Sequence, residues 1–97
     1  MEKRIYLNEL YDYYGALLTE KQQKYFEEYY FDNYSLAEIA QNNNVSRNAV
    51  HNQIKIVEER LEFFEEKLSL HSKKTKIIDI LQNNIEVSTL ERIIDLL

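Results

Sequence analysis

Apolar residues recur at helical spacing along most of the chain. In the first segment, residues 4–18, they fall three or four positions apart, which is typical of one face of an amphipathic helix. These residues are Leu7, Leu10, Tyr11, Tyr14, Leu17 and Leu18. A second helix is predicted to begin at Thr19, with Gln22 at capping-box spacing, and to end near residues 31–33. The aromatic side chains within residues 25–34 are expected to pack inward, because rings at helical spacing usually do so.

Residues 35–54 have the pattern of two helices joined by a tight turn. Ser35 is a good N-cap, and Glu38 completes a capping box. The asparagines at 42–44 are predicted to end this helix, because asparagine tolerates the left-handed backbone of a tight exit. Ser46 is predicted to cap the next helix. The residues expected to pack between the two helices are Leu36, Ile39, Ala40, Val45, Ala49, Val50 and Ile54. This is the pattern of a helix-turn-helix, whose second helix usually enters the major groove of DNA.

The helix that begins after Ser46 has no stop signal until about His71. Its apolar residues step by four and three positions, which is the spacing of a coiled-coil seam. The seam consists of Val50, Ile54, Val57, Leu61, Phe64 and Leu68. Such a seam packs either on the chain's own helices or on a partner. We expect its upper part to serve the chain's own core and its lower part to form a homodimer interface. The residues assigned to this dimer seam are Val57, Leu61, Phe64 and Leu68.

A break at residues 69–72 is predicted to separate this long helix from a C-terminal pair of helices. The first of the pair follows Lys73, Lys74 and Lys76, and the second is predicted to be capped by Ser88, with Glu91 at capping-box spacing. We expect the pair to cover the core or a dimer surface. The whole chain, residues 1–97, is therefore predicted to be one all-α domain. It comprises a helix-turn-helix core with one long central helix in residues 1–71 and a helical pair in residues 72–97.

Composition agrees with this prediction. A chain of 97 residues is long enough for one small domain, and one glycine with no proline favours helices joined by short connections. The absence of cysteine excludes disulfides and thiolate metal sites. No apolar run is long enough to span a membrane, and no apolar signal segment follows the charged first residues. We therefore expect a cytoplasmic protein without membrane insertion.

Charge narrows the choice of a binding surface. The net charge of −5 argues against a strong non-specific polyanion binder, because lysine and arginine supply that affinity. Between Ile39 and Val57, however, the only charged residues are Arg47 and Lys55. The candidate nucleic-acid-binding residues are Arg47, Asn48, His51, Asn52 and Lys55. Arg47 and Asn48 suit base edges, whereas Lys55 suits a phosphate. An ordinary polar helix face is the alternative interpretation of these five residues.

Nothing in the sequence supports catalysis. His51 and His71 lie twenty residues apart on what is predicted to be one helix, too far apart to share a metal. We expect His51 to be an exposed contact residue and His71 to lie at the C-terminal end of its helix, where an imidazolium is favourable. Paired glutamates are typical of a solvated helix face, and no glycine-rich phosphate loop is present. We therefore expect no enzymatic activity, no cofactor and no metal site.

The middle of the chain resembles region 4 of bacterial sigma factors, in which a similar helix-turn-helix reads the promoter −35 element. The resemblance lies in residues 18–23, with the sequence LTEKQQ, in Phe26 and Tyr30, and in residues 34–40 and 45–50. The chain is closer in detail to the YlxM family of helix-turn-helix proteins. That resemblance covers residues 5 to about 70 and adds Leu10-Tyr11-Asp12, Tyr29-Tyr30 and Glu65-Glu66-Lys67-Leu68. The chain departs from the usual helix-turn-helix pattern at Asn44, where glycine is common.

The resemblance implies a helical fold of the sigma-region-4 type. It also implies an accessory or regulatory role in the signal recognition particle pathway, because the family's genes lie beside those of the particle's GTPase and receptor. Two functions stay open. In the first, the chain binds nucleic acid, either DNA or the particle's RNA, through the helix that starts at Ser46. In the second, the chain is a protein–protein adaptor that binds particle components through its acidic and aromatic surfaces.

Overall fold

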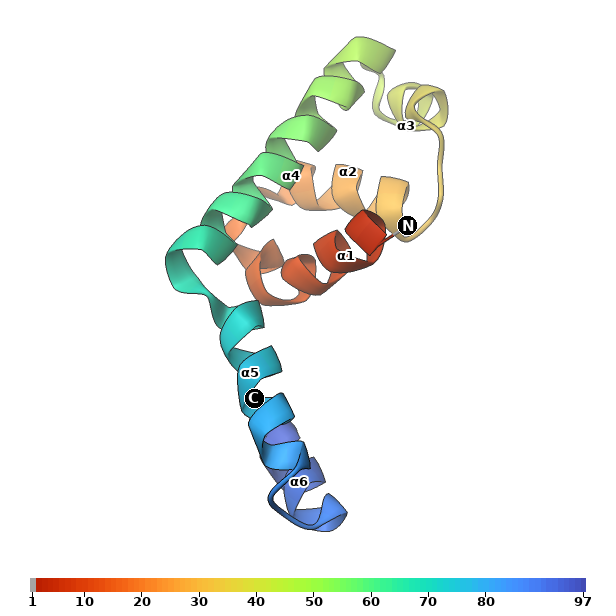
Figure 1. The fold of residues 1–97 in the computed structure, drawn as a ribbon. Helices are drawn as coiled ribbons and strands as arrows, with labels where there is room; N and C mark the ends of the chain where they lie inside the picture. Colours follow the sequence, from red (N-terminus) through yellow and green to blue (C-terminus); the bar gives the residue numbers. More distant parts are fainter. Residues whose placement is uncertain (1) are drawn as a thin grey trace.

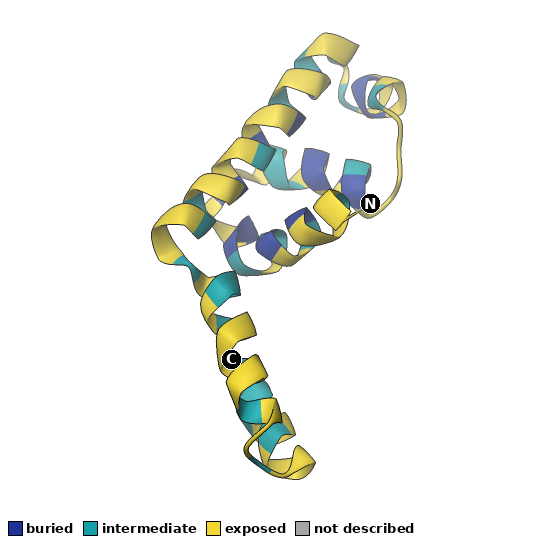
Figure 2. Cartoon of the chain, in the orientation of Figure 1, coloured by how far each residue is buried: buried dark blue, intermediate teal, exposed yellow. Residues whose placement is uncertain are grey.

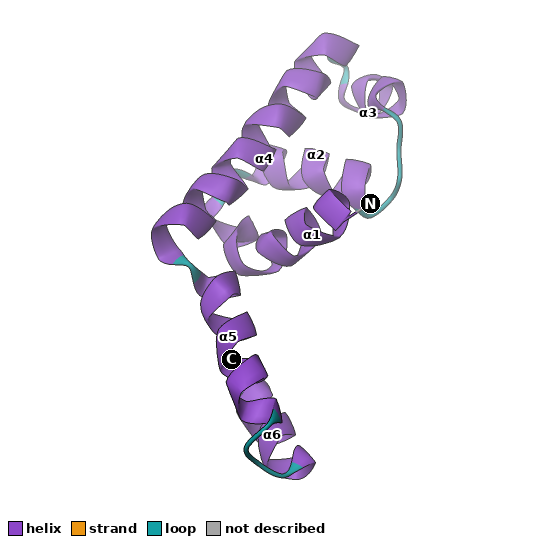
Figure 3. Cartoon of the chain, in the orientation of Figure 1, coloured by secondary structure: helices purple, strands orange, loops and turns teal. Residues whose placement is uncertain are grey.

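The computed structural model describes residues 2–97, which form helices joined by short connections (Figure 1). No strand occurs in this part of the chain (Figure 3). The helices are α1 (Glu2–Tyr14), the 3-10 turn η1 (Gly15–Leu17), α2 (Glu20–Tyr30), α3 (Leu36–Asn43), α4 (Arg47–Leu68), α5 (Leu70–Gln82) and α6 (Val87–Ile94). The predicted all-α helix-turn-helix bundle with one long helix is confirmed.

The long helix α4 is the element against which α1, α2 and α3 all pack (Figure 1). Buried side chains from these four helices form one core, which lies along one side of α4 (Figure 2). Its fully buried members are Leu7, Leu10, Tyr14, Phe26, Ile39, Val50, Val57 and Leu61, each 0% exposed. The prediction that the aromatics between Tyr25 and Tyr34 pack inward is confirmed for Tyr25, Phe26 and Tyr30, which are buried. It is wrong for Phe31 and Tyr34, which are 46% and 39% exposed.

Gly15 ends α1 earlier than the sequence predicted. The helix stops at Tyr14, and Gly15 begins the 3-10 turn, where it is buried against the ring of Tyr11. A Cβ atom at this position would lie 3.0 Å from two ring atoms, so only glycine allows the close approach without displacing the ring. The turn also rotates Leu17 away from the core. This residue is 57% exposed, and its predicted place on the apolar face was wrong.

The predicted N-caps of the middle helices are confirmed. Thr19 and Gln22 form a capping box at α2, and Ser35 and Glu38 form another at α3. The hydroxyl of Ser46 accepts the backbone N–H of Ala49 at 3.0 Å and caps α4. These hydrogen bonds are local, which is why the sequence alone locates them.

Asn44 ends α3 in the left-handed conformation, with φ 55° and ψ 43°. We expect Asn44→Ala to lower the free energy of unfolding by about 1 kcal/mol, because a Cβ-bearing residue without a side-chain amide is disfavoured there. Asn44→Gly is the matched variant and should unfold at or above the wild-type urea midpoint, since glycine adopts this conformation without steric cost. Equal destabilisation by both substitutions would show that the side-chain amide, and not the backbone conformation, matters at this turn.

The C-terminal pair departs from the prediction at its cap. Ser88 does not cap the last helix, because α6 already begins at Val87 after Glu86 and has no side-chain cap. Of the two predicted roles of the pair, covering the core is excluded and covering a dimer surface stays a prediction. The pair projects from the end of α4 as a hairpin, and none of its residues is buried (Figures 1 and 2). The molecule is consequently elongated, with principal extents of 52 × 25 × 23 Å.

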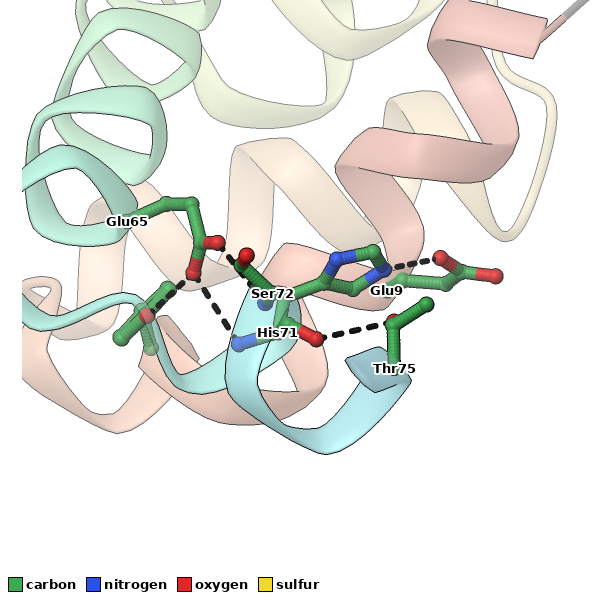
Figure 4. Close-up of polar contacts among 6 residues, drawn as sticks. Glu9, Glu65, His71, Ser72 and Thr75 are labelled. Atoms are coloured by element: carbon green, nitrogen blue, oxygen red, sulfur yellow. Dashed lines mark hydrogen bonds and ion pairs between the residues drawn. The ribbon is translucent and has the colours of Figure 1, made fainter. Parts of the chain in front are cut away.

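A hydrogen-bonded junction around Glu65 fixes the base of this hairpin (Figure 4). Ser69 adopts a left-handed conformation between the helices, with φ 56°. The carboxylate of Glu65 accepts the hydroxyl of Tyr14 at 2.6 Å and the backbone N–H groups of His71 and Ser72 at 3.1 and 3.0 Å. The oxygen of Tyr14 in turn accepts the N–H of Leu70 at 3.0 Å. One side chain of α4 therefore caps the first turn of α5 and ties it to α1.

His71 belongs to this junction and not to the end of the long helix. It lies in the first turn of α5, so the prediction of a C-terminal helix position was wrong. Its ring nitrogen Nε2 lies 2.5 Å from a carboxylate oxygen of Glu9, and its ring meets Tyr6 edge-on with centroids 5.2 Å apart. The ring thus links α5 to α1 at a second point.

Candidate nucleic-acid interface

The short connection between α3 and α4 sets the geometry of the helix-turn-helix. Ile39 and Ala40 on α3 are buried against α4, where Val50 and Ile54 receive them. The side chain of Asn43 donates to the carbonyl oxygen of Ile39 at 2.7 Å and closes the end of α3. Core packing therefore holds the first part of α4 on one side and leaves the other side free.

The five candidate residues all lie on this free side. Arg47, Asn48, His51, Asn52 and Lys55 are all exposed. Asn48, Asn52 and Lys55 fall at i, i+4 and i+7, so these three side chains line one face of the helix. The structure thus brings the candidate residues together on one surface, in residues 47–55 at the start of α4 (Figure 1).

The first backbone N–H groups of α4 are further hydrogen-bond donors, in addition to the five candidate side chains. Ser46 accepts the N–H of Ala49, and the first turn of α4 contains no acidic residue. The first N–H groups of a helix have no intrahelical acceptor, and the helix dipole makes this end favourable for a phosphate. The signal was available in the sequence, since a serine cap followed by Arg47 and no acid predicts such an end.

Glu38 on α3 and Glu58 on α4 both accept hydrogen bonds within the fold. The backbone N–H of Ser35 donates to Glu38 and lowers the pKa of this carboxyl, which therefore carries charge at neutral pH. Tyr30 donates its hydroxyl to Glu58, and burial followed by this hydrogen bond raises the pKa of Tyr30. A groove of about 320 Å³ lies beside them. It is lined by Tyr29, Leu36, His51, Ile54, Lys55 and Glu58.

The lysines near residue 75 do not join this surface. Lys73, Lys74 and Lys76 lie on α5, beyond the opposite end of α4 (Figure 1). That helix has 22 residues and is roughly 33 Å long at 1.5 Å per residue. A phosphate contacted by Arg47 is therefore far from these lysines within one chain.

The four residues assigned to the dimer seam do not form one exposed surface. Val57 and Leu61 are 0% exposed and belong to the core of the single chain. Phe64 is half-buried and packs on this core, with its ring 5.9 Å from that of Tyr14. Only Leu68 is exposed, at 45%. In the single chain, the heptad spacing therefore corresponds to packing of α4 on α1 and α2, and of the four residues only Leu68 is left exposed to a partner.

Two other findings concern metal binding and membrane crossing in the described part of the chain. Within residues 2–97, no three histidine or carboxylate side chains are grouped so that they could hold a metal ion. None of the helices in the same range combines the length and apolar character needed to cross a bilayer.

Comparison with known proteins gives a consistent family. The sequence model of UPF0122, described as "Putative helix-turn-helix protein, YlxM / p13 like", matches residues 1–95. A UPF0122 protein of Halalkalibacterium halodurans is 51% identical over 82 residues, which cover 84% of this chain and 75% of the relative. A UPF0122 protein of Geobacillus sp. is 54% identical over 76 residues, or 78% and 69% of the two chains. A third, from Thermoanaerobacter sp., is 44% identical over 86 residues, or 86% and 74%.

Proposed function

Because the chain belongs to the UPF0122 family of YlxM- and p13-like helix-turn-helix proteins, we propose that it is a regulatory protein that binds nucleic acid through residues 47–55 of α4. The observation that carries the proposal is the exposed face itself. Two basic side chains, two asparagines and a histidine project from a capped helix start that contains no acid. A helix of this width fits the major groove of B-DNA, which is about 12 Å wide.

Roles follow from position on the helix. Arg47 and Asn48 stand in the first turn, where recognition helices contact base edges, and their side chains suit guanine and adenine respectively. Lys55 stands two turns further on and suits a phosphate. The first N–H groups of α4 add an uncharged phosphate contact. Binding of this kind is modest in affinity and salt-dependent, since few cations take part.

We propose that the nucleic acid belongs to the signal recognition particle pathway, as the YlxM resemblance implies. The ligand is then either DNA that controls genes of this pathway or the particle's own RNA. The helix-turn-helix geometry favours duplex DNA, because the major groove of an RNA duplex is too deep and narrow for a helix.

We expect Arg47→Ala to weaken DNA binding about tenfold or more, because one good base contact contributes about 1–3 kcal/mol. Fluorescence anisotropy with labelled duplex at low salt measures the loss. Arg60→Ala is the matched control: Arg60 is also exposed on α4, but lies beyond residues 47–55, and its removal changes the net charge by the same amount. A wild-type protein that binds neither duplex DNA nor the particle's RNA at low salt contradicts the proposal.

A second candidate function is an adaptor that binds proteins of the same pathway. It is favoured by the acidic far half of α4, where Glu59, Glu62 and Glu66 are exposed. An adaptor should change the GTPase rate of the particle's GTPase without nucleic acid, and Arg47→Ala should leave that change intact. If the chain instead acts by binding nucleic acid, the GTPase rate should not change without nucleic acid, and Arg47→Ala should abolish the activity of the chain.

A further inference from the structure

The hairpin formed by α5 and α6 carries an apolar stripe that no part of residues 2–97 covers. On α5, Leu70, Ile77 and Ile80 are 43%, 39% and 62% exposed. Together with Lys73 they step by three, four and three positions, which is the spacing of helices that pack on one another. Beside the stripe lies a hollow of about 180 Å³. It is lined by Tyr13, Leu70, Lys73, Lys74, Ile77 and Leu97.

The other face of α5 is already in use. Residues 71, 74, 78 and 81, also at spacings of three and four, are partly buried, and α5 contacts both α1 and α6. The helix thus has two packing faces, and the chain itself satisfies only one. A helix with a second apolar face is typical of a contact surface, because monomers rarely expose contiguous apolar patches without a function.

A second uncovered stripe lies on α4, from the middle of the helix toward its C-terminal end. Phe63 is 53% exposed and Ile56 is 39% exposed, seven positions apart on the side opposite the core. Exposed carboxylates line one side of this stripe, namely Glu59, Glu62 and Glu66. Arg60 and Lys67 line its other side, and the ammonium group of Lys67 lies 5.5 Å from the centre of the Phe63 ring.

The acidic side of the α4 stripe is opposite in charge to the α5 stripe. The stripe on α5 is flanked by Lys73 and Lys76, both exposed, whereas this side of the α4 stripe carries Glu62 and Glu66. None of these four residues forms an ion pair within 4.0 Å in residues 2–97, where the pairs formed are Lys24–Glu28 and His71–Glu9. The charges are therefore free to act on a partner, and the lysines of α5 are complementary to the acidic side of the α4 stripe.

We propose that these two stripes are the halves of a self-complementary dimer interface. The α5 stripe of one chain packs on the α4 stripe of a second copy, and a two-fold axis repeats the contact. Pairing of two α5 stripes alone would cover a single helix face about 20 Å long. Such a contact is smaller than the roughly 800 Å² per partner of a standard interface. It would also bring lysines of both chains together, whereas the two-fold arrangement pairs lysine with glutamate.

This dimer does not depend on the proposed nucleic-acid binding. Its contact centres on Phe63, about two turns beyond residues 47–55, and only Ile56 of the α4 stripe adjoins them (Figure 1). Two copies joined in this way present two exposed helix starts related by the two-fold axis, which is the symmetry of a palindromic DNA site.

Light scattering after size-exclusion chromatography tests the interface on the full chain. At about 100 µM, well above a micromolar dissociation constant, we expect a mass twice the 11.7 kDa of the chain. Ile80→Glu should reduce the mass to that of one chain while circular dichroism stays helical, because Ile80 is already 62% exposed. Leu17→Glu is the matched control, because Leu17 is 57% exposed in the turn η1, outside both stripes. This variant should stay dimeric. A monomeric wild type, or a dimeric Ile80→Glu variant, overturns the proposal.

A charge exchange tests which stripes meet. We expect Lys73→Glu/Lys76→Glu and Glu62→Lys/Glu66→Lys each to be monomeric alone and to dimerise when mixed. Both contacts of the mixed dimer regain opposite charges, whereas each variant alone has like charges. If the α4 variant alone stays dimeric, the acidic stripe is not part of the interface and the proposed pairing is wrong.

Discussion

Leu61→Glu is expected to leave the domain unfolded. Leu61 is 0% exposed in the core between α4 and its neighbours. Removing a buried leucine side chain already costs about 2–5 kcal/mol, and an unpaired buried carboxylate adds several more. A domain of this size has a total free energy of unfolding of about 5–15 kcal/mol, with small cores at the low end. Far-ultraviolet circular dichroism and one-dimensional NMR should therefore show a largely unfolded chain at 25 °C.

Leu68→Glu is the matched comparison on the same heptad seam. Leu68 is 45% exposed, so a glutamate at this position keeps its hydration, and we expect the thermal midpoint to fall by only a few degrees. A folded Leu61→Glu variant would mean that Leu61 is solvated and that α4 packs differently from the structure described above. The pair of variants thus separates the two interpretations of the heptad spacing.

Glu65→Ala is expected to release the C-terminal hairpin from the core. The substitution removes the acceptor of the Tyr14 hydroxyl and of two N–H groups in the first turn of α5. Hydrogen bonds to a charged group contribute more than neutral ones, but part of this site is open to water, so we expect a loss of about 2 kcal/mol at the junction. Hydrogen exchange should show faster exchange in α5, while the amides of α4 around Val57 stay protected.

Glu20→Ala is the matched control, because Glu20 is exposed at the start of α2, outside the junction and the proposed dimer interface, and its side chain makes no hydrogen bond to the rest of residues 2–97. It should leave exchange in α5 unchanged. Equal acceleration by both variants would indicate that the loss of charge or helix propensity, and not the junction, is responsible.

The junction should also depend on pH. Burial opposes ionisation of Glu65, but hydrogen bonds from Tyr14, His71 and Ser72 outweigh it and lower the pKa of the carboxyl below its ordinary value of 4.5. A lowered folded-state pKa means that the stabilisation is present above pH 4.5 and is lost as pH falls through the folded pKa. Exchange in α5 should therefore accelerate in acid before the core amides lose protection. Glu65→Gln should remove this acid dependence.

The local signals in the sequence predicted the helix ends well. The caps at Thr19, Ser35 and Ser46 and the left-handed exit at Asn44 are each decided by side chains within three residues of the backbone groups they satisfy. The prediction that Ser88 caps the last helix was wrong for a related reason. Two candidate starts lie within three residues there, and a short exposed helix has little packing to select between them.

The candidate surface was also predictable. Five polar residues with no acid among them occupy the face of α4 opposite Val50 and Ile54, and helical periodicity alone separates these two faces. Periodicity did not predict the junction at Glu65, because the hydrogen bond that ties it to α1 joins Tyr14 and Glu65, which lie 51 positions apart. Glu65 therefore resembled any other solvated glutamate in the sequence.

By itself, the sequence determined the helices, the helix-turn-helix and which polar residues share the exposed start of α4. Only the tertiary structure decided what each apolar face packs against. A spacing of three and four residues shows which side chains share a face of α4, but it is the same whether the face meets α1 or a second copy. The structure places Val57 and Leu61 in the core of one chain, turns the hairpin away at Ser69, and leaves the stripes around Ile77 and Phe63 uncovered. These outcomes depend on contacts between distant residues, which local spacing does not specify.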